Sequence, residues 1–212
     1  MTVRNAESMG THNATWEVRG YAGQGNVAQL IDTLHSRTVI VCGNAVSVFH
    51  DLERAMKQTK DPVIFAVNDI GMYLPKLDHW VSLHADYLGA WKTVRWNHAT
   101  RGETTRYHTY EAKPFSDFHW QNLTPVMALS GYFAMQIAWI MGAERIILAG
   151  CPGMQMRRFF EAESTGNHYG NGNNGSDKGI LEQLTREMAR VPAFKKAVRS
   201  MSGWTNRYFG GI

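Results

Sequence analysis

The stretch from Thr38 to Leu52 reads TVIVCGNAVSVFHDL, and its pattern decides the fold class. Its first five residues, Thr38–Cys42, are apolar or β-branched, which is typical of a strand buried on both faces. The small and polar residues Gly43–Ser47 break that strand, and an amphipathic helix is expected to follow to about Gln58. Many folds hold a phosphate at a strand–turn–helix of this kind. The stretch matches neither a GxGxxG fingerprint nor a Walker loop, so a simple turn is the alternative interpretation.

Further runs of this kind recur along the chain. Apolar segments at Pro62–Val67, His79–Leu83 and Arg145–Gly150 predict three more buried strands. Ser130 is expected to cap a helix over Gly131–Met141, which is apolar nearly all round and should therefore lie at the centre of the fold. Strands alternating with helices indicate βαβ units. We therefore expect an α/β fold, a single Rossmann-like domain with a mainly parallel sheet flanked by helices.

Less regular segments surround this expected core. We assign residues 1–25 to an N-terminal arm, residues 26–190 to the Rossmann-like domain and residues 191–212 to a basic C-terminal tail. Within the domain, the Gly- and Asn-rich residues 151–176 are expected to form a lid. Residues 93–122 are rich in His, Arg and aromatic side chains, and we expect them to form loops with one possible strand, as segments that cover active sites often do.

Composition limits the classes of function. The 212 residues are 44% hydrophobic and carry a net charge of +4, which suits a globular protein that binds anionic small molecules. No run of five like charges occurs, so nucleic acid is not the expected partner. Cys42 and Cys151 do not form a CxxC pattern, so neither a zinc site nor a disulfide framework is expected. With no apolar leader and no apolar stretch long enough to span a membrane, we expect a cytoplasmic protein.

Small and polar residues follow every expected strand and precede the buried helix. In an open parallel sheet, ligands bind outside the carboxyl ends of the strands, so these residues are the candidates for a binding site. They are Gly43, Asn44 and Ser47; Asn68 and Asp69; His84 and Asp86; Ser130 and Gly131; and Gly150, Cys151 and Gly153. Each one could instead serve only as a turn residue or a helix cap.

Other side chains are candidates for the chemistry itself. His84 and Asp86 lie two residues apart and could form an acid–base pair or part of a metal site, or could lie on the surface. His168 in the Gly/Asn-rich segment could be a general base brought over the site by a loop. Arg157 and Arg158 could hold a phosphate or could be solvated. Three tryptophans could stack on a base or sugar, or could belong to the core: Trp80, Trp91 and Trp96.

Three motifs in this set resemble those of the bacterial CMP-sialic-acid-dependent sialyltransferases. The motifs are VIVCGNAVSV, VIFAVND and LSGYFAMQIAWIMGAERIILAGCPG, within residues 38–153 but not in residues 93–122. In that family the first strand ends in Gly-Asn-Gly-Pro-Ser-Leu, the second in Cys-Asn, and a Thr-Ser-Gly opens a helix before a strand that ends in Ser-Gly-Ile-Asp. The motifs also resemble a related Rossmann-like group that includes hydroxymethylpterin diphosphokinase-like proteins. The C-terminal VRSMSGWTNRYFGG looks like the ends of phage and prophage proteins, which suggests a phage-encoded chain.

The sialyltransferase resemblance implies a glycosyltransferase-like enzyme that transfers a sugar from a nucleotide to an acceptor hydroxyl without a metal. The resemblance implies that the phosphate and ribose are faced by Gly43, Asn44 and Ser47, and that Asn68 faces the nucleotide or donor sugar. Ser130 and Gly131 would face the nucleotide from the other side. His168 would be the general base, with His84 as the other candidate, and the leaving phosphate would be stabilised by Arg157 and Arg158. The chain departs from the family at Ala45-Val46, where the relatives have Gly-Pro, and after Gly150, where the acidic residue is missing.

Two alternatives remain open at this stage. A diphosphokinase-like transferase would need Mg²⁺, and the carboxylates that could hold it are Asp69, Asp86 and Asp78. A phage-encoded module could instead keep the Rossmann-like shell and bind a nucleotide or a protein without catalysis.

Overall fold

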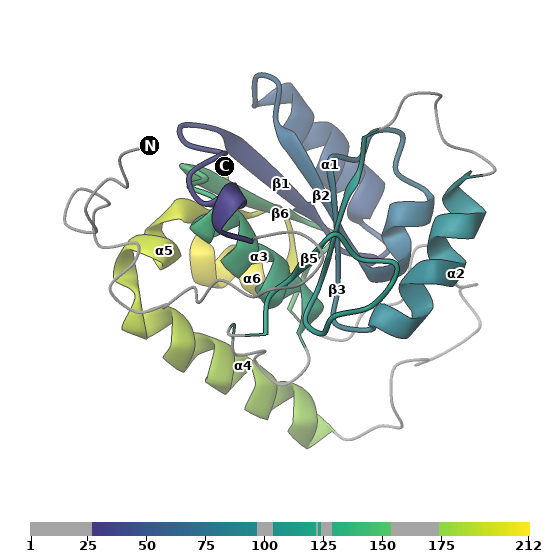
Figure 1. The fold of residues 1–212 in the computed structure, drawn as a ribbon. Coiled ribbons are helices and arrows are strands. Elements are labelled where there is room, and N and C mark those ends of the chain that lie inside the picture. The colour runs from purple at the N-terminus through teal and green to yellow at the C-terminus, as the bar shows by residue number, and fades with distance from the viewer. Residues whose placement is uncertain (1–26, 97–103, 122, 124–128, 154–173) are drawn as a thin grey trace, which may run out of the picture.

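A computed structural model describes residues 27–96, 104–121, 123, 129–153 and 174–212. The sheet has seven strands in the order β5-β4-β3-β2-β1-β6-β7, and every neighbouring pair is parallel. Helices flank this sheet, so the expected α/β fold with a parallel, Rossmann-like sheet is confirmed (Figure 1). The expected N-terminal arm and most of the expected lid lie outside the described residues.

The strands are β1 (Thr38–Cys42), β2 (Val63–Val67), β3 (His79–Ser82), β4 (Arg106–Thr109), β5 (Phe118–His119), β6 (Arg145–Ala149) and β7 (Val198–Ser200). The α-helices are α1 (Val48–Lys57), α2 (Ala85–Trp96), α3 (Ser130–Ile140), α4 (Asn174–Arg190), α5 (Pro192–Ala197) and α6 (Gly203–Phe209), with 3-10 turns η3 (Val27–Leu30) and η4 (Asn68–Met72).

The order of the strands places a topological switch point between β1 and β6. From β1 the chain adds β2, β3, β4 and β5 on one side, and then crosses back to add β6 and β7 on the other. Ile40 of β1 pairs with Ile64 of β2 and with Ile147 of β6, so the carboxyl ends of these three strands lie side by side. Ligands of open parallel sheets bind at such a point.

Alternation along each strand divides the core between the two faces of the sheet. Val39 and Val41 pack on one face with α3, α4 and α5, whereas Ile40 and Cys42 pack on the other face with α1 and α2. Figure 1 shows these two helical layers on either side of the strands. Ten of the eleven residues of α3 are buried, which confirms the expectation of a central helix. A buried leucine-sized side chain contributes ~2 kcal/mol, so these layers hold the strand ends firmly in place.

The C-terminal residues that we assigned to a tail belong to the fold. Residues Pro192–Phe209 form α5, β7 and α6, and β7 extends the sheet by pairing Val198 with Ile146 of β6. Phe194 and Val198 are completely buried. The three-residue strand has a polar centre, Arg199, and follows two lysines, so no apolar run marked it in the sequence.

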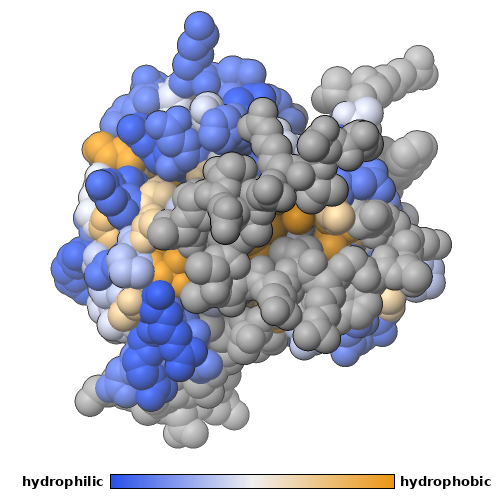
Figure 2. Space-filling view, turned by 60° about the vertical axis from the view of Figure 1, so that its left-hand side comes forward, coloured by the Kyte–Doolittle hydropathy of each residue, from blue (hydrophilic) through white to orange (hydrophobic). Residues whose placement is uncertain are grey.

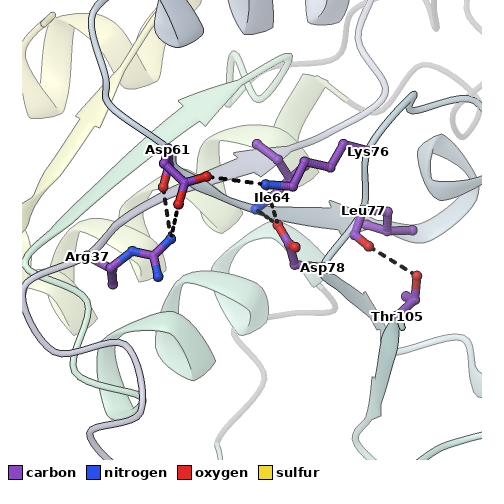
Figure 3. A network of polar contacts seen from close by, with 7 residues as sticks. All are labelled: Arg37, Asp61, Ile64, Lys76, Leu77, Asp78 and Thr105. Carbon is purple, nitrogen blue, oxygen red and sulfur yellow. Dashed lines mark hydrogen bonds and ion pairs between the residues drawn. The ribbon is translucent and has the colours of Figure 1, made fainter. Parts of the chain in front are cut away.

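The amino edge of the sheet, opposite the carboxyl ends of the strands, is closed by a network of polar contacts (Figure 3). Asp61 accepts a hydrogen bond from Arg37 at 3.1 Å and lies 3.6 Å from the Nζ of Lys76. Asp78 accepts a 2.7 Å hydrogen bond from the backbone N–H of Ile64, which joins the start of β3 to β2. Exposed ion pairs contribute little, so the Asp78 bond is the part of the network that fixes strand register. It also places Asp78 far from the carboxyl edge, away from the other candidate metal ligands.

A chain of three hydrogen-bonded rings links β3, β4 and the residue after β5. Trp120 Nε1 lies 3.1 Å from Nδ1 of His108, and Nε2 of His108 lies 2.8 Å from Nδ1 of His79. Because an indole only donates, His108 accepts at Nδ1, carries its proton on Nε2 and donates it to His79. Burial lowers the pKa of His79 to about 3 and the pKa of His108 well below its usual range, with Arg106 adding to both effects. Both rings are therefore neutral at pH 7.

Hydrophilic side chains cover most of the described surface seen in Figure 2, with small apolar areas among them. Among the described residues, the most exposed large apolar side chain is Tyr87, at 62%. No helix in the described part of the chain has the length and apolar character needed to cross a membrane.

Candidate functional site

Two glycines bring the β1 and β6 exits into contact at the switch point. A Cβ added to Gly43 would lie 2.5 Å from the carbonyl oxygen of Gly150 and 2.7 Å from Sγ of Cys151, so only glycine fits there. Gly150 has φ +63°, and a Cβ on it would lie 2.6 Å from Cβ of Val48. Backbone hydrogen bonds from Gly43 to Ala149 and from Ala45 to Gly150 join the two loops. Contact with Gly150 and Cys151 therefore requires a glycine at position 43, whether or not a ligand approaches it.

Asn44 and Asp69, which follow adjacent strands, are in direct contact. Nδ2 of Asn44 donates a 2.8 Å hydrogen bond to Oδ1 of Asp69, and Asp69 is only 7% exposed. A carboxylate only accepts hydrogen bonds, so the amide nitrogen must face Asp69 and the carbonyl oxygen of Asn44 must face away from it. This hydrogen bond therefore connects the residues that follow β1 with those that follow β2.

Asn68 adopts a left-handed conformation, with φ 57°, which asparagine tolerates better than most residues. Trp80 Nε1 donates to its backbone oxygen at 2.6 Å, and Ser82 Oγ donates to its Oδ1 at 2.9 Å. These bonds use its oxygens and leave the side-chain amide as the group that can donate to a ligand. Trp80 is completely buried, so it supports Asn68 from the core and is not a stacking platform.

Ser47 faces a carboxylate that the sequence analysis missed. Its hydroxyl donates to Oδ2 of Asp51 at 2.9 Å, and the same oxygen accepts from Ser202 at 2.7 Å and from the backbone N–H of Gly150 at 3.0 Å. Asp51 is 2% exposed and joins the start of α1 to the β6 and β7 exits. A signal for it was present: Asp51 lies three residues after Val48 and four before Ala55, on the buried face of α1, where a charge needs a partner.

The C-terminal segment, residues 198–209, hydrogen-bonds to the loop that follows β6. Thr205 Oγ1 donates to the carbonyl oxygen of Cys151 at 2.6 Å, and its backbone N–H donates to Pro152 at 3.1 Å. Thr205 is buried, and Ser202 from the same segment reaches Asp51. Residues after the sequence-predicted domain boundary therefore help to shape the candidate site.

Ser130 and Gly131 open α3 beside this loop. A Cβ on Gly131 would lie 3.9 Å from Sγ of Cys151, the atom that also packs against Gly43. The predicted site residues after β1 and those at the start of α3 therefore both lie next to Cys151. The helix begins at Ser130, so this serine occupies the first turn and Leu129 takes the cap position expected for Ser130. Ser130 is 5% exposed, and among the described residues its hydroxyl has no hydrogen-bond partner. No acidic residue lies in the first turn, which leaves its N–H groups suited to an anion.

His84 and Asp86 lie at the end of β3 but do not form a pair. Asp86 makes a 2.9 Å ion pair with Lys113 and its side chain is 80% exposed, whereas His84 lies edge-on to Tyr87. In the described part of the chain, no three His, Cys, Asp or Glu side chains come together as a metal site would require. Asp69 and Asp86 are thus engaged with Asn44 and Lys113.

Three predicted site residues, Arg157, Arg158 and His168, lie outside the described residues. The side chain of Trp96 also lies outside them, and Trp91 is half-buried and stacks on Tyr87.

Neither cysteine is suited to nucleophilic chemistry. Burial raises the pKa of the Cys151 thiol to about 12, and burial raises the pKa of Cys42 further. Both thiols are therefore protonated near neutral pH, and Cys151 acts at the site as a packing residue between Gly43 and Gly131.

Comparison with solved structures finds a similar fold. No family model matches the chain, and no curated protein matches it significantly. The chain is similar in structure to the sialyltransferase CstII from Campylobacter jejuni, solved in complex with a substrate analogue, CMP-3FNeuAc, with a TM-score of 0.53 and 12% sequence identity over 81% of this chain and 84% of that one. At this identity the likeness shows the fold alone, and it confirms the sialyltransferase resemblance at that level. It gives no support to a phage origin or to a relation with pterin diphosphokinases.

Proposed function

We propose that this protein is a glycosyltransferase-like enzyme that binds a nucleotide or nucleotide-sugar at the carboxyl ends of β1, β2 and β6. The observation that carries the proposal is that Gly43 and the start of α3 both lie against Cys151 at the switch point, with Asn44, the residue after Gly43, hydrogen-bonded to Asp69 at the end of β2. A sialyltransferase solved with a CMP-sugar analogue has the same fold, which supports a ligand of that class.

The first turn of α3 is the proposed site for the nucleotide phosphate. Its open N–H groups and the buried hydroxyl of Ser130 are donors, and an ionised phosphate only accepts. These donors would stabilise the negative charge that develops on the phosphate as the sugar departs. We propose that no metal is needed, because this helix end supplies the stabilisation.

A histidine would remove the proton of the acceptor hydroxyl. The oxygen would then form its bond to the anomeric carbon of the sugar as the bond from that carbon to the phosphate oxygen breaks, and the nucleotide leaves with the bonding electrons. His84 lies exposed at the end of β3 and is the described candidate, and His168 is the candidate outside the described residues.

The experiment is calorimetric titration of CMP, UMP and GDP, and of CMP-sialic acid, into the wild-type protein and Asn44→Ala. We expect one of these ligands to bind. Asn44→Ala should lower the affinity for that ligand about tenfold, because one hydrogen bond from an ordered loop to the ligand is lost. Met56→Ala, an exposed change on α1, is the matched control and should bind as the wild type does. Absence of binding by the wild type, or equal affinity in Asn44→Ala, would refute the proposal.

A magnesium-dependent transferase is less well supported. It would need a cluster of carboxylates, whereas Asp86 is paired with Lys113, Asp69 accepts from Asn44, and Asp78 lies at the other edge of the sheet. Repeating the titrations with ATP, with and without Mg²⁺, separates the two activities. A module that binds a nucleotide without catalysis would show binding and no sugar transfer.

A further inference from the structure

The net positive charge of this chain comes from its last 22 residues. Residues 191–212 contain no acidic side chain and four basic ones, which we call the basic edge: Lys195, Lys196, Arg199 and Arg207. The other 190 residues carry 18 basic and 18 acidic side chains, so the formal net charge of +4 comes entirely from this segment. A charge asymmetry of this kind indicates an anionic partner for one end of the molecule.

The basic edge lies at the β7 end of the sheet, where α5 and α6 are close to one another (Figure 1). Nζ of Lys195 on α5 lies 4.1 Å from the ring centre of Tyr208 on α6. Arg199 of β7 donates from Nη1 to the carbonyl oxygen of Lys196 at 2.8 Å, which holds the guanidinium beside the end of α5. A Cβ on Gly210, the residue after α6, would lie 4.0 Å from Cδ of Arg199. The basic side chains are therefore carried by one folded surface.

Within the part of the chain that the structure describes, no carboxylate forms an ion pair with the basic edge. Lysines on the α1 and α2 side of the molecule differ in this respect, because Lys57 pairs with Glu53 at 2.6 Å and Lys113 pairs with Asp86 at 2.9 Å. Lys196 is also exposed to solvent, as are most of its neighbours on the outer side of α5. The charge of the basic edge is therefore open to a partner.

The aromatic rings of this surface are poorly placed to stack on nucleic acid bases. Trp204 and Tyr208 stack on each other with ring centres 4.8 Å apart, and Lys195 lies over the ring of Tyr208. Proteins that bind single strands instead offer open aromatic faces along a basic groove. Among the described residues, no exposed large apolar side chain belongs to residues 191–212, so the surface also lacks the apolar anchors on which protein partners depend. A partner that needs only positive charge fits this surface best.

From these observations we propose that the basic edge docks the protein on an anionic lipid surface. The headgroups of a bilayer can gather beneath exposed cations, so no shaped pocket is needed. Each cation near an anionic membrane raises the partition coefficient about fivefold, and the four together raise it about 600-fold. Docking of this kind is reversible, because it has no inserted anchor. The proposal goes beyond the proposed function and does not depend on it.

Sedimentation with lipid vesicles tests the proposal on the full chain. Vesicles of phosphatidylcholine with about one quarter phosphatidylglycerol should bind the wild type, and vesicles of phosphatidylcholine alone should not. Raising the salt from about 0.1 M to about 1 M shortens the Debye length from about 10 Å to about 3 Å, so it should release the protein. Equal binding to neutral and anionic vesicles, binding that survives the salt, or no binding to either would overturn the proposal.

Two double variants test whether the basic edge is the docking surface. Lys196→Gln with Arg207→Gln removes two exposed charges and should weaken vesicle binding about thirtyfold. Arg54→Gln with Lys60→Gln, the matched control, removes two exposed charges in and just after α1, which packs on the other face of the sheet. The control should weaken binding by less than about threefold, because charges farther from the lipid than a Debye length are screened. Equal losses in the two double variants would overturn the assignment to the basic edge.

Hydrogen exchange locates the contact without any variant. Anionic vesicles should slow exchange in α5 and α6 and leave α1 unchanged, and slowing confined to another element would overturn the proposal. Single-stranded DNA and polyglutamate test the other two classes of partner, and tighter binding of either one than of anionic vesicles at the same salt would overturn the assignment to lipid. None of these measurements uses a nucleotide, so failure of this proposal is distinguishable from failure of the proposed function.

Discussion

Replacing His79 by asparagine should make the protein less sensitive to acid. His79 and His108 are buried, neutral and hydrogen-bonded to each other at 2.8 Å. In the unfolded chain both rings bind protons below pH 6.5, their ordinary pKa. The folded state binds none until far lower pH, because burial lowers the pKa of His79 to about 3 and that of His108 well below its usual range. Acid therefore favours the unfolded state, and the contribution is constant above about pH 6.5.

The magnitude follows from this difference in proton binding. One pKa unit corresponds to about 1.4 kcal/mol, so each histidine lowers the free energy of unfolding by about 2 kcal/mol between pH 6.5 and 5.0. The pair together accounts for about 4 kcal/mol, a large part of the stability of an ordinary domain. His79→Asn removes one of the two protons, and its Oδ1 can still accept from Nε2 of His108.

Urea unfolding followed by circular dichroism from pH 7.5 to 5.0 measures this effect. Below about pH 6.5, the free energy of unfolding of His79→Asn should fall less steeply with acid than that of the wild type, by about 1.4 kcal/mol per pH unit. His50→Asn removes an exposed histidine and is the matched control, with a slope equal to that of the wild type. Equal slopes in the wild type and His79→Asn would refute the account of a neutral buried pair.

Three other changes test the packing and polar contacts at the strand ends. Gly150→Ala should lower the free energy of unfolding by about 2–4 kcal/mol, because φ is +63° and the added Cβ would lie 2.6 Å from Val48. Gly179→Ala, the control in open space on α4, should raise the free energy of unfolding by about 0.5–1 kcal/mol. Thermal and urea unfolding measure both changes, and an equal effect of the two would contradict the close packing around Gly150. Asp51→Asn should destabilise by about 1–3 kcal/mol, because an amide oxygen accepts the three hydrogen bonds now made to Oδ2 more weakly than a carboxylate oxygen does, and unchanged unfolding in urea would show that this difference contributes nothing. Thr205→Val should cost about 1 kcal/mol through the lost bond to Cys151, and a melting temperature equal to that of the wild type would argue against support from the C-terminal segment.

The central strands and helix were predictable because their sequence signal is strong. Continuous apolar runs mark β1, β2 and β6, and a helix that is apolar all round, such as α3, can only be central. β5 and β7 have two and three residues, too few for any periodicity, so they form only because neighbouring strands already offer an edge. Pairing of this kind, between β7 and β6, is why residues 191–212 belong to the fold and do not form the expected tail.

The candidate site was predictable in position but not in orientation. Parallel strands align their carboxyl ends, so Gly43, Asn44 and Asn68 could be grouped from the sequence. The direction of each hydrogen bond depends on partners far away in the chain, such as Ser202, which is 155 residues from Ser47. Asp51 itself was detectable as a charge on the apolar face of α1, but its partners were not.

A structure of the protein with CMP at saturating concentration tests the central claim most directly. The account predicts a nucleotide at the carboxyl ends of β1 and β6, with its phosphate at the start of α3 beside Ser130. An empty edge at saturation, or a nucleotide bound elsewhere on the molecule, would contradict it.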